Sequence, residues 1–189
     1  MNKKSLLLVI SSLLISNLAL ADTAGDTQTV SVTVPSVKLL DIKAASGTST
    51  SADEADALSF TLTAPTVAGD NFSAVTHATG GFYDVTSNVV SGGSTARKVT
   101  VSADALSAGW KLTLAPTAVS GATANTINFT SSDVASKDLV TAIGNVAAKD
   151  TAISYTFGPE SASIVPSYTG TDGTTSENIV LTFTLSDDV

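Results

Sequence analysis

The chain has 189 residues, with 17 acidic and nine basic side chains, a formal net charge of −8 and no cysteine. The negative charge argues against nucleic acid and anionic lipid as partners, since both are bound by clustered lysine and arginine. The lack of cysteine excludes disulfides, thiol catalysis, cysteine zinc sites and iron–sulfur clusters, so stability has to come from the core and from backbone pairing.

The first 21 residues have the features of a secretory signal peptide. Lys3 and Lys4 give a basic start, residues 5–18 are mainly apolar, and Ala19-Leu-Ala21 offers a small-x-small cleavage site. The apolar run is shorter than the about 20 residues that a membrane-spanning helix needs. We therefore expect cleavage and export of a single domain, residues 22–189, with no integral membrane segment.

Short segments in which apolar and polar residues alternate recur along the chain, as in half-buried strands. They lie at residues 28–34, 37–42, 58–62, 82–85, 97–103, 110–114, 126–130, 152–157 and 179–185. Loops rich in Gly, Pro, Ser and Thr separate them. This pattern predicts an all-β fold, an antiparallel β-sandwich of about 8–10 strands with Thr- and Ser-rich outer faces.

Two segments add detail to this prediction. Residues 110–114 place Trp110, the only tryptophan, on the inward face, so we expect it to anchor the core. Near residues 133–148, Leu139, Ile143 and Val146 recur at three- and four-residue intervals. That spacing predicts one short amphipathic helix lying across an open end of the sandwich.

The sequence has no recognisable catalytic motif. His77 is the only histidine, which excludes a paired-histidine metal site, and no Gly-x-Ser-x-Gly elbow lies near it. The acidic cluster Asp53, Glu54 and Asp56 lacks the spacing of an EF-hand, so we interpret it as a solvated loop, with calcium binding as the alternative. We expect a non-enzymatic protein without a cofactor, and keep a hydrolase that uses His77 as a remote alternative.

The segment at residues 28–34, followed by Pro35 and Val37-Lys-Leu-Leu-Asp41, resembles the N-termini of cysteine-free fimbrial pilins. In those pilins the N-terminal segment leaves its own subunit and fills a missing strand in the next one. The resemblance implies that Val30, Val32 and Val34 form a strand-exchange segment. The alternative is that the same residues form an ordinary first strand.

A second resemblance is carried by Trp110-Lys111-Leu112 together with Phe183-Thr-Leu185. These segments resemble the WxL domain of bacterial cell-surface proteins, which has one Trp-x-Leu near its middle and another near its C-terminus. Here Phe183 stands where the second tryptophan is found. The resemblance implies an exported β domain that associates with the cell wall.

Together these observations predict a secreted bacterial surface or extracellular structural protein. We expect it to act by self-assembly into a fibre, pilus or matrix, with further copies of the chain as partners, or by association with the cell envelope. The alternative is a WxL-like module that binds cell-wall or envelope polysaccharide. Both place the protein outside the cytoplasm, in the periplasm, at the cell surface or in the medium.

Overall fold

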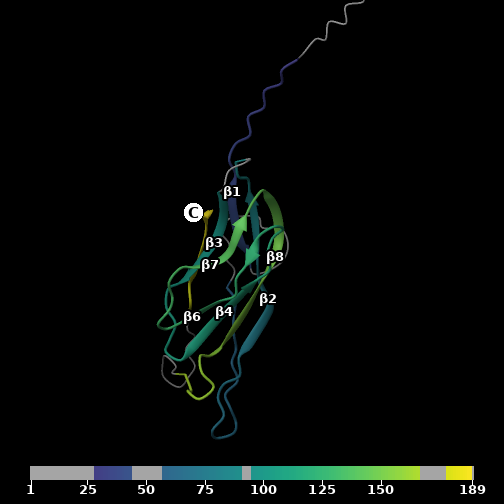
Figure 1. Ribbon diagram of the computed structural model, residues 1–189. Helices are drawn as coiled ribbons and strands as arrows, with labels where there is room; N and C mark the ends of the chain where they lie inside the picture. Colours follow the sequence, from purple (N-terminus) through teal and green to yellow (C-terminus); the bar gives the residue numbers. More distant parts are fainter. Residues whose placement is uncertain (1–27, 44–56, 91–94, 167–177, 189) are drawn as a thin grey trace, which may run out of the picture. The chain divides into compact units, whose positions relative to one another are not determined.

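The computed structural model describes residues 28–43, 57–90, 95–166 and 178–188. In these residues the chain forms nine β-strands and no helix. The strands are β1 (Lys38–Lys43), β2 (Val75–Ser87), β3 (Ala96–Ala103), β4 (Trp110–Pro116), β5 (Thr123–Ala124), β6 (Ile127–Thr130), β7 (Lys137–Ile143), β8 (Val146–Pro159) and β9 (Leu181–Asp188) (Figure 1).

The strands form two antiparallel sheets. One sheet has the order β1-β2-β8-β4-β6 and the other the order β5-β7-β3-β9. Figure 1 shows β3, β7 and the C-terminal strand on one side and β2 and β8 on the other. The predicted all-β sandwich is confirmed, and β1 and β9 are edge strands of different sheets.

The chain divides into two compact units, residues 1–34 and 35–189, and all nine strands belong to the second. The predicted signal peptide and the acidic cluster Asp53, Glu54 and Asp56 lie outside the described residues. In the described ranges the chain contains no helix that could cross a membrane.

The core follows the alternation seen in the sequence. On β3, Val99 and Val101 are buried while the residues between them are half-buried. Trp110 at the start of β4 is 7% exposed, stacks on Phe157 at 5.1 Å between ring centroids and lies 5.5 Å from the ring of Phe72. The only tryptophan thus belongs to the core, where offset and tilted aromatic pairs are favourable.

The predicted helix near residues 133–148 is wrong. Strand β7 and the start of β8 occupy this region. Its pairing with β3 is irregular around Val99, and Leu139 and Val140 are both buried. A bulge that turns two successive side chains to the same face breaks the two-residue period. With Ile143 buried three residues later, the irregular strand imitates helical spacing.

Residues 58–62 keep their predicted alternation without forming a strand. Leu58, Phe60 and Leu62 are half-buried and pack against the core, while Ser59 and Thr61 are exposed. The ring of Phe60 lies 5.8 Å from that of Phe157. Alternation decides which side chains are buried, but a strand also needs a neighbour with free backbone groups at the right spacing.

The core predicts the cost of losing a large side chain. Phe129 on β6 is fully buried, so Phe129→Ala should lower the free energy of unfolding by about 3–5 kcal/mol. The matched substitution Asn128→Ala changes an exposed neighbour on the same strand and should cost about 1 kcal/mol or less. Urea denaturation followed by tryptophan fluorescence measures both. Equal losses would contradict this packing.

Tyr83 predicts how stability changes at alkaline pH. Its hydroxyl donates a hydrogen bond to the carbonyl oxygen of Thr117 at 2.7 Å, and burial raises its pKa from 10.0 to about 12. The folded state holds the phenol proton more tightly than the unfolded state. The resulting stability is therefore complete below pH 10 and is lost as the pH rises toward 12.

Tyr83→Phe should cost about 1 kcal/mol at pH 7 through the lost hydrogen bond. It should also remove about 1 kcal/mol of the loss that the unmodified chain suffers between pH 9 and pH 11. Urea unfolding at the three pH values measures both effects. An identical alkaline loss in the two proteins would show that Tyr83 does not carry it.

Candidate functional site

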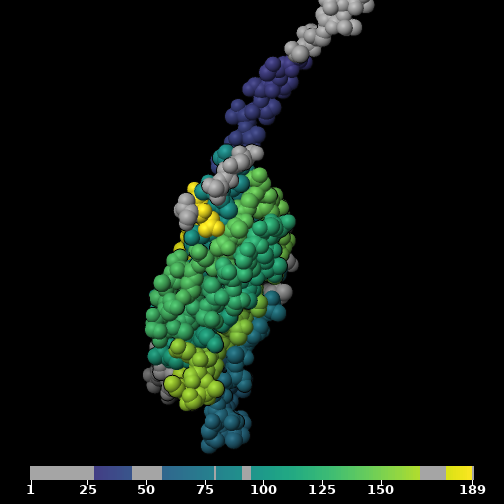
Figure 2. All heavy atoms as spheres, in the orientation of Figure 1, coloured from purple at the N-terminus to yellow at the C-terminus, as the bar shows by residue number. Residues whose placement is uncertain are grey.

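Burial on the inner face of the sandwich decreases at β9. The inward-facing residues Leu181, Phe183 and Leu185 are only half-buried. Their pairing partners on β3 are at most 8% exposed. Because paired residues of antiparallel strands share a face, the change reflects the edge position of β9. Figure 2 shows part of this C-terminal strand, in yellow, at the molecular surface.

Strand β1 shows the same change in the other sheet. Leu40 and Ile42 are half-buried, whereas their partners on β2, Val85 and Tyr83, are each 1% exposed. Inward apolar side chains are therefore half-buried on both of these edge strands. Each has one backbone edge without a strand partner in the described part of the chain.

These two edges lie beside each other. Lys38 Nζ at the start of β1 is 3.7 Å from Asp187 Oδ1 near the end of β9, so the start of one edge strand lies next to the end of the other. We call the inward apolar residues along this boundary the open seam. They are Leu40 and Ile42 of β1 and Leu181, Phe183 and Leu185 of β9. Free edges next to apolar side chains are the features that strand addition uses.

A buried guanidinium marks one end of the open seam. Arg97 pairs with Asp187 in the β3–β9 register, and its side chain is 8% exposed. Nη2 donates to Ser36 Oγ at 3.2 Å and to the carbonyl oxygen of Asn88 at 3.0 Å. Nε lies 3.8 Å from Asp187 Oδ1, beyond hydrogen-bond distance.

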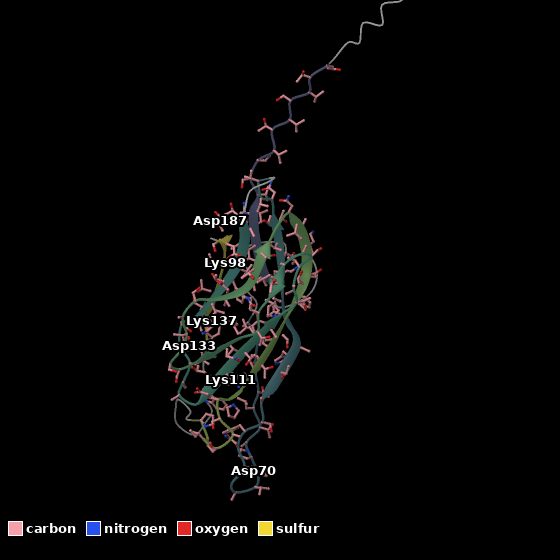
Figure 3. All side chains as sticks on the ribbon, viewed as in Figure 1. Asp70, Lys98, Lys111, Asp133, Lys137 and Asp187 are labelled. Atoms are coloured by element: carbon pink, nitrogen blue, oxygen red, sulfur yellow. The ribbon has the colours of Figure 1, made fainter. Side chains whose placement is uncertain are left out.

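Nε and Nη1 of Arg97 are buried without a hydrogen-bond partner among the described residues. A buried donor left unsatisfied costs about 1–3 kcal/mol, and more when it is charged. The guanidinium therefore has unused hydrogen-bonding capacity at the end of the open seam where Asp187 lies. Figure 3 shows Asp187 near Lys98 at one end of the sandwich, with Asp70 at the other.

A cluster of three charged residues, Lys43, Asp84 and Asp150, attaches the end of β1 to its sheet. Lys43 Nζ lies 2.8 Å from Asp84 of β2 and 2.7 Å from Asp150 of β8. Burial alone would lower the pKa of Lys43, but the hydrogen bonds and negative charges of Asp150 and Asp84 together raise it above 10.5. The lysine is therefore charged at neutral pH and links β1 to its neighbour β2 and to β8, the next strand of the sheet.

Residues 28–34 carry exposed apolar side chains, whereas those of the open seam are half-buried. Val30, Val32 and Val34 are 73–76% exposed, and residues 28–34 form no β-strand. Exposed valines at alternate positions have no folding benefit in an isolated chain. Gln28 is exposed as well and is in phase with the valines.

The residues of the WxL-like pattern lie in two different sheets. Trp110 and Leu112 are buried in β4, and Lys111 between them is half-buried. Phe183 and Leu185 belong to β9 and to the open seam. The tryptophan ring therefore packs within the protein and does not form an exposed binding surface.

His77 and the metal-ligating side chains are the remaining candidates from the sequence. His77 in β2 is half-buried, and its ring meets that of Phe60 edge-on at 4.8 Å. In the described ranges no three metal-ligating side chains come together. The sequence analysis did not identify Arg97 as a candidate. Its inward position could have been predicted, because Arg97 is in phase with the inward residues Val99, Val101 and Ala103 of the same alternating strand.

Comparison of the chain with family models, with curated proteins and with solved structures finds no match.

The half-burial of β9 predicts a contrast between two phenylalanines. Phe183→Ala in the open seam should cost about 1–2 kcal/mol in dilute, monomeric protein, because much of its transfer free energy is not realised there. Phe129→Ala, at a fully buried position, should cost at least twice as much. Urea unfolding of the two variants measures the difference, and equal costs would mean that the seam is closed in the free subunit.

Proposed function

We propose that this protein is an exported structural subunit that polymerises by strand addition, with residues 28–34 of one copy occupying the open seam of another. One observation carries the proposal. The chain has an exposed segment with valines at alternate positions, and it also has a half-buried apolar row beside strand edges that have no partner in the described residues. The segment can supply a strand and apolar side chains, and the open seam can supply a backbone edge and an apolar surface to cover them.

The two surfaces match in period. Residues two apart on an extended strand are about 6.6 Å apart, so Val30, Val32 and Val34 repeat at the spacing of Leu181, Phe183 and Leu185. Burial of each valine contributes roughly 1.5–3 kcal/mol before ordering costs are subtracted. The intervening Thr29, Ser31 and Thr33 face the opposite side of the added strand, where the sandwich presents a polar surface.

The backbone supplies the second part of the interaction. The free edge of β9 has N–H and C=O groups that can extend its antiparallel ladder by one strand. The incoming segment has no proline between residues 28 and 34, so each of its residues retains its backbone donor. This kind of recognition requires no cofactor and no catalytic side chain.

The contact joins two different surfaces of identical chains. Such a heterologous interface produces an open chain of subunits unless its rotation closes a ring. A filament or matrix component outside the cytoplasm is consistent with the signal-peptide features at residues 1–21.

Changing the face of the segment tests this proposal. Val32→Asp should abolish polymers, because a carboxylate would be buried in the apolar seam, and should leave the fold of the monomer unchanged because Val32 is 76% exposed. The matched variant Ser31→Asp places the same charge on the polar face and should still polymerise. Electron microscopy and analytical ultracentrifugation of the purified proteins distinguish the two results. Polymers of Val32→Asp, or a monomeric unmodified protein, would contradict the proposal.

A further inference from the structure

We infer that Arg97 is the receptor for the Gln28 side chain of the incoming segment, and that this contact sets the direction and register of strand addition. The inference rests on the proposed assembly. It identifies one pair of residues, from two copies of the chain, as the determinant of how the copies join.

The order of polar and apolar residues favours one direction. Read from Leu181, the inward row of β9 is Leu, Phe and Leu and then reaches Asp187, which pairs with Arg97. Read backwards from residue 34, the matching row of the segment is three valines followed by Gln28. An antiparallel alignment with Val32 beside Phe183 therefore brings Gln28 beside Asp187 and within reach of Arg97.

The parallel alignment lacks this match. With Val32 again beside Phe183, Gln28 would lie beside Ile179, a half-buried residue that packs against the core. A neutral amide placed against an apolar side chain loses its water without gaining a partner. The polar pattern of the segment therefore selects the antiparallel direction, which is also the direction of every described strand pair in the two sheets.

The chemistry of Gln28 fits the groups at this end of the seam. Its amide oxygen accepts a hydrogen bond, and Nε and Nη1 of Arg97 are buried donors without a partner in the described chain. Its amide nitrogen donates to a carboxylate, and Asp187 supplies one 3.8 Å from Nε of Arg97. A neutral side chain with both functions completes the site without adding charge to an existing ion pair.

The direction has a structural consequence. Antiparallel addition brings residue 34 of the incoming copy to the Leu181 end of β9, whereas β1 begins near the Asp187 end. Residue 35 leads into β1 of its own domain, so successive domains are joined head to tail and the chain stays open. Parallel addition would bring the β1 starts of two copies together and permit a closed, reciprocal dimer.

The first test compares neighbouring residues of the segment in the full-length exported chain. Gln28→Ala polymers should dissociate in guanidinium at least about tenfold faster than unmodified polymers, as expected for a lost hydrogen bond to a charged group. Thr29→Ala, on the opposite face, should stay within about twofold. In an Arg97→Met background, Gln28→Ala should add less than about twofold, because its partner is already absent.

The second test uses the absence of cysteine in the chain. In the antiparallel register Val30 lies beside Leu185, so the double variant Val30→Cys with Leu185→Cys should form a ladder of covalent oligomers on a non-reducing gel. Directly opposed strand residues have the short Cβ separation that a disulfide needs. The matched pair Val34→Cys with Leu185→Cys reports the parallel register and should give no ladder.

The outcomes separate the inference from the proposal beneath it. Polymers that Val32→Asp abolishes, but that respond equally to Gln28→Ala and Thr29→Ala, would overturn the role of Gln28 and Arg97 alone. If the Val34→Cys, Leu185→Cys variant formed the ladder and the Val30→Cys, Leu185→Cys variant did not, the antiparallel direction would be overturned. An unmodified chain that forms no polymer would overturn both the assembly and this inference.

Discussion

The apolar inner faces of the two sheets must be covered along their whole width, and the described chain does not complete this cover where β1 and β9 border each other. Other inward side chains are fully buried between the sheets, among them Phe129, Leu139 and Ile153. At the open seam the inward side chains of β1 and β9 are half-buried, and each strand has a backbone edge without a partner in the described residues. Unpaired edges beside apolar side chains favour association with another strand.

The incomplete cover at the open seam relates two other features of the structure, the Lys43 cluster and Arg97. The Lys43 cluster fixes β1 to its sheet, so the position of the β1 side of the open seam is well defined. Arg97 is a buried charge at the Asp187 end of the β9 side. Buried ionic groups of this kind contribute little net stability, and their best-attested use is to specify which arrangement forms. In the assembly proposed here, Arg97 specifies register and the valine row supplies the free energy.

Much of the fold could be predicted from alternation. The strands around Val99 and Trp110, and the terminal strand with Phe183, lie where the two-residue period placed them. The period failed at Leu139 and Val140, because a bulge turned adjacent side chains inward and so imitated a helix. It also could not show that residues 58–62 lack a strand partner, since pairing depends on distant segments.

The all-β class, the inward position of Trp110 and the valine row of residues 28–34 can be read from the amino-acid sequence, because they depend only on which residues alternate. The three-dimensional contacts were needed to show that β1 and β9 lie at sheet edges next to each other, and that Arg97 is buried there with two donors that have no partner among the described residues. Those properties arise from contacts between segments far apart in the chain. Local periodicity states which face of a strand is apolar, but not which neighbour covers it.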